Sequence, residues 1–108
     1  MSGPPRDRAP DPGLALLHAL AASAPRGSAI ELVDMTSTGW GSATFTGARH
    51  VIRLRGRDDP ALASWLAGLL EAQFRLRGHL VADIALASVE RCGGSAAVVV
   101  EALTLDEA

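Results

Sequence analysis

The sequence predicts an α+β domain, with a four-stranded, mostly antiparallel sheet and two helices packed on one face of it. Helix and strand signals follow one another along the 108 residues in the order α-β-β-α-β-β. Segments rich in glycine and hydroxyl residues join the strands of each pair, as is typical of hairpins. Apolar residues make up 48% of the chain, enough for a core shared by one sheet and two helices.

The chain divides into a short tail and one domain. Residues 1–10 contain three prolines and show no apolar periodicity, which predicts a disordered or loosely ordered N-terminal tail. Residues 11–108 have the length of a single α+β domain. A chain of this size needs no disulfide or metal to stabilise its core.

The first helix is predicted to begin at Asp11 and to end before Pro25. Asp11 is a good N-cap, and Pro12 suits the first helical position because its missing N–H would have no intrahelical partner there. Apolar residues follow at helical spacing at Leu14, Leu17, Leu20 and Ala21.

The second helix is predicted to run from Pro60 to Gly78. Asp58 or Asp59 caps it, and Gly78 has the position of a left-handed residue that ends a helix. Its apolar stripe consists of Leu62, Trp65, Leu66, Leu69 and Leu76. Further apolar residues widen this stripe, so we expect the helix to touch a second surface such as another subunit.

The first strand pair contains a candidate loop. Residues 30–35 are predicted as a strand, residues 36–42 (TSTGWGS) as a wide turn, and residues 43–46 as a resumed strand. Whether residues 41–56 form one bent strand or two stays open. Alternation places His50, Ile52 and Leu54 on one face, and Arg49, Val51, Arg53 and Arg55 on the other.

The last strand pair is predicted as a hairpin with a three-residue loop, Cys92-Gly93-Gly94. This register pairs Leu86 with Val100 and Ile84 with Ala102. The face assigned to the helices carries Leu80, Ala82, Ile84 and Leu86. The outer face carries Val81, Asp83, Ala85, Ala87 and Val89, with Ala97, Val99, Glu101, Leu103 and Leu105 from the partner strand. An outer face this apolar is typical of an interface or a ligand groove.

Asp83 and Glu101 are the main candidate site residues on the outer face. They are expected to lie diagonally across the strand pair, about 7–8 Å apart, with Arg53 and Arg55 nearby. One interpretation is a carboxylate pair in a low-dielectric cleft, suited to acid–base chemistry. The favoured interpretation is ion pairing with Arg53 or Arg55, within the chain or across a dimer.

Two further residues are candidates for ligand contacts. Trp40 lies between two glycines of the predicted turn, where its ring could stack on a flat ligand beside an anion held by hydroxyl and N–H groups. The favoured interpretation is a simple turn with its Trp folded onto the core. Gln73 lies on the apolar side of the second helix, and a hydrogen bond within the protein is favoured over a ligand contact.

Composition argues against several classes of function. The net charge of −2 and pI near 5.8 do not suggest a polyanion binder. Alternating arginines between residues 49 and 57 would suit phosphates, but stacking aromatics are few, so nucleic-acid binding is not expected. All ten basic residues are arginine, which indicates the codon bias of a GC-rich bacterial genome more than anion recognition.

Histidine and cysteine usage predicts no metal site and no cofactor. His18, His50 and His79 lack the spacing of zinc ligands, and His50 is expected to be a buried, hydrogen-bonded side chain. The single cysteine, Cys92, excludes an intrachain disulfide and favours a reducing compartment, so a cytoplasmic location is expected. No apolar run is long enough to span a membrane.

The expected function is a non-catalytic module that oligomerises as a homodimer or binds a protein partner, because no catalytic motif is recognisable in the sequence. The alternative is a small-molecule binding protein or modest enzyme, with an anionic ligand in a cleft on the outer sheet face.

Overall fold

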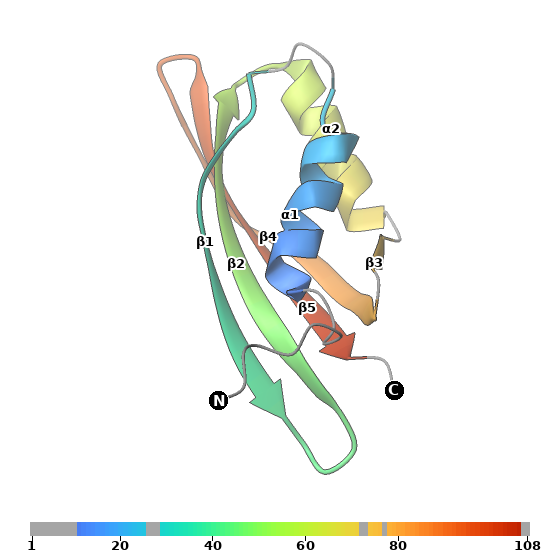
Figure 1. Ribbon diagram of the computed structural model, residues 1–108. Helices are drawn as coiled ribbons and strands as arrows, with labels where there is room; N and C mark the ends of the chain where they lie inside the picture. Colours follow the sequence, from blue (N-terminus) through green and yellow to red (C-terminus); the bar gives the residue numbers. More distant parts are fainter. Residues whose placement is uncertain (1–10, 26–28, 72–73, 77, 107–108) are drawn as a thin grey trace, which may run out of the picture.

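The computed structural model describes residues 11–25, 29–71, 74–76 and 78–106 as one antiparallel sheet with both helices on the same face (Figure 1). The elements in chain order are α1 (Pro12–Ser23), β1 (Glu31–Gly41), β2 (Thr46–Arg57), α2 (Pro60–Glu71), β3 (Arg75–Leu76), β4 (His79–Cys92) and β5 (Ser95–Asp106). The predicted α-β-β-α-β-β order and helix-covered antiparallel sheet are confirmed. The short β3 is an addition, and the tail expected at residues 1–10 lies outside the described residues.

The sheet is built from two long hairpins joined through the last strand. Its order is β1-β2-β5-β4-β3, so β5 is central and pairs antiparallel with β2 on one side and β4 on the other. The tips of the two hairpins lie at opposite ends of the molecule (Figure 1).

Helix α1 begins as predicted. Asp11 Oδ1 accepts a hydrogen bond from the Gly13 N–H at 2.9 Å, and the helix ends at Ser23, two residues before Pro25. Its packing stripe differs from the prediction, because Leu16 and Leu20 are buried while Leu14 is 52% exposed. In this alanine-rich helix several stripes are comparably apolar, so the spacing alone does not select the buried one.

The wide turn predicted at residues 36–42 is wrong. Strand β1 continues to Gly41, and the chain reverses over residues 42–45. Ser42 closes this turn, since its N–H donates to the Phe45 carbonyl at 2.7 Å and its Oγ accepts from the Phe45 N–H at 3.1 Å. The threonines of the predicted turn are β-branched and fit a strand. Residues 41–56 are neither one bent strand nor two, because Gly41 ends β1, residues 42–45 form the turn and β2 begins at Thr46. The resumed strand predicted at residues 43–46 is therefore also wrong.

Helix α2 starts where predicted but ends earlier. Asp59 caps it, with its Oδ1 accepting from the Leu62 N–H at 2.9 Å. Its described helical residues end at Glu71, and Leu76 is buried as part of β3. Gly78 does have a positive φ of 79°, but it serves the turn between β3 and β4. A glycine suits a helix end and a tight turn equally well, so its presence did not distinguish them.

The β4–β5 hairpin has the predicted pairs but a different loop. Leu86 pairs with Val100 and Ile84 with Ala102, as predicted. However, Cys92 pairs with Ser95, so the loop has two residues, glycines with φ of 58° and 82°. A bulge between Leu86 and Ser88 shifts the register by one residue and restores the predicted pairs.

Two bulges in β4 also change which side chains face the helices. Register shifts occur between Val81 and Asp83 and between Leu86 and Ser88. Because each bulge inverts the alternation, Leu80 pairs with outward Leu105 and is 51% exposed, contrary to prediction. Val89 instead pairs with the buried Val98, so it points to the helix side and not outward.

The core lies between the helices and the inner side of the sheet. Every second residue of β5 points into it, and the buried set of this strand is Ala96, Val98, Val100, Ala102 and Thr104. On β2 the buried set is His50, Ile52, Leu54 and Gly56, which confirms the predicted alternation. The opposite side of the sheet, called the outer face below, is covered by neither helix.

Candidate functional site

The outer face presents charges on β1, β2 and β4 around a largely apolar central strand. Arg49, Arg53 and Arg55 pair in register with the outward residues Leu103, Val99 and Ala97. All three arginines therefore lie on the outer face, which includes Arg53 and Arg55 as expected. The outward side chains of β5 are Ser95, Ala97, Val99, Glu101, Leu103 and Leu105.

Asp83 and Glu101 come together, as predicted, and Arg49 joins them. Asp83 pairs with Leu103 while Glu101 pairs with Ala85, so the two carboxylates are diagonal neighbours. All three charged side chains line a shallow depression of about 100 Å³. With two carboxylates against one guanidinium, the depression offers more negative than positive charge.

The other two predicted arginines lie outside this depression. Arg53 forms an ion pair with Asp34 of β1 at 3.4 Å, and both side chains are more than half exposed. An ion pair this exposed contributes little to stability. Arg55 lies two residues after Arg53 on the same face of β2, opposite Glu31 of β1.

Trp40 lies on a strand and not in a loop. It pairs with Gly47 at the end of β1 and is half-buried. Its indole N–H is buried and donates to no atom of the described residues. Gln73, the other candidate for a ligand contact, lies outside the described residues.

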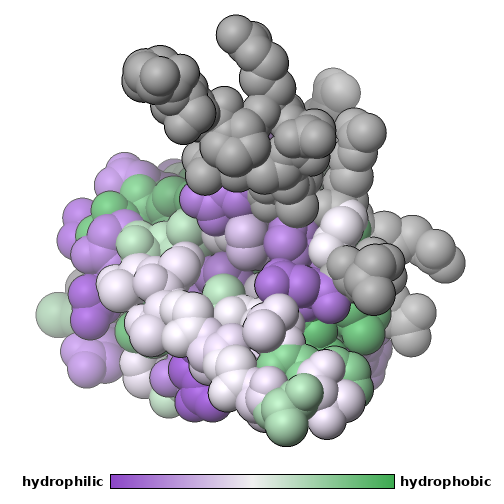
Figure 2. Space-filling view, turned by 60° about the horizontal axis from the view of Figure 1, so that its bottom comes forward, coloured by the Kyte–Doolittle hydropathy of each residue, from purple (hydrophilic) through white to green (hydrophobic). Residues whose placement is uncertain are grey.

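The end of the molecule near the β1–β2 tip carries no broad apolar surface among its described residues. Figure 2 shows that hydrophobic residues there form separate small groups among neutral and hydrophilic ones. The exposed Phe45, at the tip itself, is flanked by threonines. This end is a poor candidate for a protein-binding surface.

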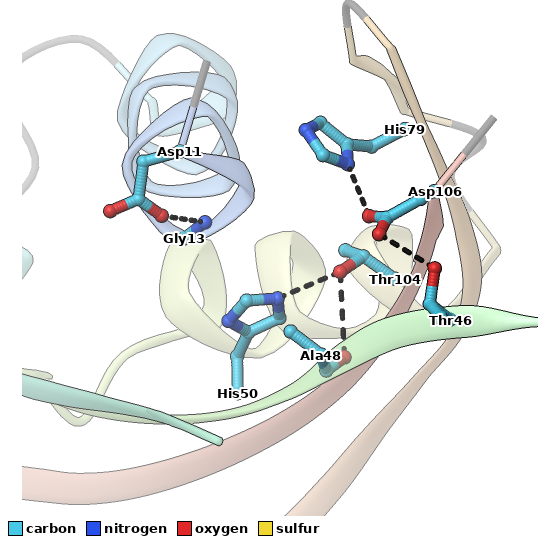
Figure 3. A network of polar contacts seen from close by, with 8 residues as sticks. All are labelled: Asp11, Gly13, Thr46, Ala48, His50, His79, Thr104 and Asp106. Atoms are coloured by element: carbon cyan, nitrogen blue, oxygen red, sulfur yellow. Dashed lines mark hydrogen bonds and ion pairs between the residues drawn. The ribbon is translucent and has the colours of Figure 1, made fainter. Parts of the chain in front are cut away.

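On the inner side of the sheet, hydrogen bonds join β1, β2 and β5 through a buried histidine. Figure 3 shows the contacts between β2 and β5. His50 is 0% exposed. Its Nε2 lies 3.0 Å from Thr104 Oγ1, and its Nδ1 lies 2.7 Å from Ser37 Oγ. Thr104 Oγ1 in turn donates to the Ala48 carbonyl at 3.4 Å. The prediction of a buried, hydrogen-bonded His50 is confirmed.

The electrostatics of His50 favour the neutral imidazole. Burial lowers the pKa of His50 below its ordinary value, an effect that Asp11 partly offsets and His79 reinforces. A neutral imidazole donates from one nitrogen and accepts at the other. Because the Thr104 hydroxyl donates its single proton to the Ala48 carbonyl, Thr104 Oγ1 accepts from the Nε2–H of His50 and the Ser37 hydroxyl donates to Nδ1. Both ring nitrogens are satisfied in this tautomer, which is the arrangement of a structural histidine.

A second group of hydrogen bonds joins the ends of β2, β4 and β5. His79 is 5% exposed, and its Nδ1 lies 3.1 Å from Asp106 Oδ1. The other oxygen of Asp106 accepts from Thr46 Oγ1 at 3.0 Å. Figure 3 shows both groups beside the start of α1. Here Asp106 orients a buried imidazole while its own side chain stays 48% exposed.

Sequence reasoning missed this second group because the signal depends on strand register. His79 and Asp106 are 27 residues apart and become partners only because β4 and β5 pair in that register. The register inferred for a three-residue loop places residue 107 opposite His79. The bulge between Val81 and Asp83 supplies the missing one-residue shift.

Within the described residues, no group of three or more histidine, cysteine or acidic side chains has the arrangement of a metal site. None of the described helices has the length and apolar character needed to cross a bilayer. Cys92 has an exposed, free thiol.

Fold and site together define an α+β protein whose antiparallel sheet is covered by helices on one face only. Comparison of the chain with protein-family models, with curated proteins and with solved structures finds no match. The function is therefore inferred from the chain's own surfaces.

Proposed function

We propose that this protein is a non-catalytic self-association module, acting in the cytoplasm, that forms a homodimer through the outer face of its sheet. The supporting observation is the arrangement of this face around the central strand β5. Its apolar column consists of Ala97, Val99, Leu103 and Leu105. Arginines of β2 lie on one side of this column and carboxylates of β4 on the other. Burial of such a column against another surface is favourable.

A two-fold axis along β5 makes the charges of this face self-complementary. Because β2 and β4 lie on opposite sides of β5, rotation about this axis places β2 of each copy over β4 of the other. Arg49 and Asp83 flank Leu103 in one row across the sheet, so Arg49 of one copy faces Asp83 of the second copy. Arg55 and Glu90 flank β5 in the same way and form a second complementary pair.

Glu101 has the opposite effect in this arrangement. It belongs to β5 itself, so the two-fold axis brings it close to Glu101 of the second copy. Two facing carboxylates repel each other. The same geometry thus predicts that some acidic residues of the outer face strengthen association while Glu101 weakens it.

The first test is sedimentation velocity of the purified protein at micromolar concentration, where we expect the mass of two chains. Arg49→Asp and Asp83→Arg should each shift the protein toward the single-chain mass. The double variant, which exchanges the charges, should recover association. Glu71→Arg provides a matched charge reversal on α2, on the helix side of the sheet, and should leave association unchanged.

Glu101→Gln should change the dimer affinity in the opposite direction. Removal of the facing carboxylates should tighten the dimer, whereas Asp83→Asn should loosen it. A single-chain mass for the wild-type protein at these concentrations contradicts the proposal. Equal effects of Asp83→Arg and Glu71→Arg also contradict it, because association then depends on net charge and not on this face.

The alternative function, a small anionic ligand held on the outer face, has less support. The depression beside Arg49 carries both Asp83 and Glu101, so an anion would meet two carboxylates there. Native mass spectrometry of the purified protein distinguishes the two functions. A co-purifying anion that Arg49→Gln removes, on a single-chain protein, would favour the alternative.

A further inference from the structure

An apolar cavity of about 370 Å³ lies on the helix side of the sheet, between α1, α2 and the inner side of β1 and β2. Its volume is within the range of small-molecule sites, roughly 300–1,000 Å³. Its main walls are Leu14, Leu17 and Ala21 of α1, Leu32 and Leu54 of the hairpin, and Trp65 of α2.

The described polar side chains near this cavity already have partners or lie at its mouth. The indole N–H of Trp65 donates to Ser23 Oγ at 3.0 Å, and Ser23 donates to the Leu20 carbonyl at 2.8 Å. Among the described lining residues, His18 is the polar one, and its side chain is exposed. An ordered water needs two to four polar partners, which these walls do not provide. The cavity therefore suits an apolar occupant.

The rim of the cavity exposes large apolar side chains to solvent. Leu14 is 52% exposed and Leu32 is 43% exposed. A second copy bound to the outer face would lie on the opposite side of the sheet and leave the cavity open.

We infer that this cavity binds a free small molecule through an uncharged aliphatic chain, with the polar end of the molecule at the mouth beside His18. Each methylene transferred from water into these walls contributes favourably to binding. This site is independent of the proposed dimer, since it lies on the other face of the sheet.

Trp65 provides the measurement. The chain has two tryptophans, and Trp40→Phe leaves Trp65, which lines the cavity, as the single one. Titration of this variant with 1-decanol should change the Trp65 emission until it saturates at micromolar concentrations. Decanoate, which has the same chain length but a charged end, should also bind, because its carboxylate lies at the mouth beside His18. Absence of a saturable change with 1-decanol overturns the inference.

A matched pair of substitutions on α1 locates the binding. Ala21 lines the cavity, whereas Ala22, also exposed on α1, does not. In the Trp40→Phe background, Ala21→Leu should weaken 1-decanol binding at least tenfold, and Ala22→Leu should change it less than twofold. Ala24→Leu, at another lining position, should repeat the loss and guards against misfolding of the first variant. Equal effects of Ala21→Leu and Ala22→Leu overturn the inference.

The competing occupant is a second copy of the chain. In that case the Trp65 emission would change with protein concentration in the absence of 1-decanol, and Ala21→Leu would reduce the sedimenting mass to one chain. That pair of results also overturns the inference. With a free small molecule as the occupant, Ala21→Leu leaves the sedimenting mass unchanged.

Discussion

At the scale of single residues, the inner side of the sheet contains a polar side chain where a purely apolar core would place a leucine. His50 is fully buried, and its two ring nitrogens contact hydroxyls from the neighbouring strands β1 and β5. A buried polar group is tolerated only where its hydrogen bonds are made. His50 therefore fixes the alignment of three strands at one level of the sheet, because slippage of either neighbour leaves a ring nitrogen without a partner.

The lowered pKa of His50 predicts that acid destabilises the fold. In the unfolded chain His50 takes up a proton as the pH falls below about 6.5, whereas in the folded chain it does so only at lower pH. The stability that His50 contributes is therefore complete above this range and is lost as the pH falls toward the folded-state pKa. Urea unfolding at pH 7.5 and pH 5 should show a lower free energy of unfolding at pH 5.

His50→Gln isolates the share of this pH dependence that belongs to His50. The variant should be less stable than the wild type at pH 7.5, but the loss of stability between pH 7.5 and pH 5 should be smaller. An unchanged pH dependence in His50→Gln assigns the effect to other groups and contradicts this account.

The two hydroxyl partners of His50 should differ in importance. Thr104 is 0% exposed, so Thr104→Val leaves a ring nitrogen unpaired and inaccessible to water, at a cost of about 1–3 kcal/mol. Ser37 lies on the exposed edge strand, where water can replace its hydroxyl, so Ser37→Ala should cost less. Chemical denaturation of both variants gives the comparison, and a greater loss for Ser37→Ala would contradict the geometry.

At the scale of elements, the sequence predicts whether a segment is a helix or a strand better than it predicts where that element begins and ends. Caps identify the start of both helices, because the Asp and Pro signals act within one turn. The wide turn at residues 36–42 was wrong because its small and hydroxyl residues occur in turns and exposed edge strands alike. The end of α2 was wrong because Gly78 serves a turn and not a helix C-terminus. In each case tertiary pairing selects between two locally acceptable structures.

The candidate site also combines features that the sequence predicts with features that depend on tertiary pairing. The association of Asp83 with Glu101 was predicted, but the predicted register is right only because the bulge between Leu86 and Ser88 offsets the one-residue difference in loop length. The His79–Asp106 contact depends on bulges in β4, and no residue of the alanine-rich strand marks where they occur. Alternation is a local property of the chain, whereas a bulge is decided by what each side chain meets on the two faces of the sheet.

The pairing of β2 with β5 depends on one glycine. A Cβ added at Gly47 would lie only 2.0 Å from the Thr104 carbonyl oxygen, whereas at Gly39 the nearest atom would be 3.9 Å away. Gly47→Ala should force the two strands apart and destabilise the protein by about 1–3 kcal/mol, as overpacking does. Gly39→Ala should be close to neutral. Thermal unfolding of both variants measures the difference, and equal melting temperatures would contradict the close approach.

At the scale of the whole molecule, the sheet separates two surfaces of different chemistry. The helix side contains the core and the apolar cavity, while the outer face combines an apolar column with complementary charges. We expect these charges to make the proposed dimer sensitive to salt, because added ions screen exposed ion pairs. Sedimentation equilibrium should show weaker dimerisation at about 0.5 M than at about 0.05 M salt. Asp83→Asn should reduce this salt dependence, and an unchanged dependence would contradict the role of Asp83.

The central position of β5 has a consequence for the order in which the protein can assemble as it is made. Strand β5, whose pairing with β2 joins the two hairpins, is the last of the seven elements to be synthesised. Until residues 95–106 emerge, β2 and β4 each have an unpaired edge. The inner apolar side chains then also lack the buried residues of β5 as packing partners. The nascent chain can form its helices and the β1–β2 hairpin early, but the core closes late and through contacts distant in sequence. This interval is when the chain is most exposed to aggregation, so synthesis that pauses before Ser95 should increase the demand for chaperones.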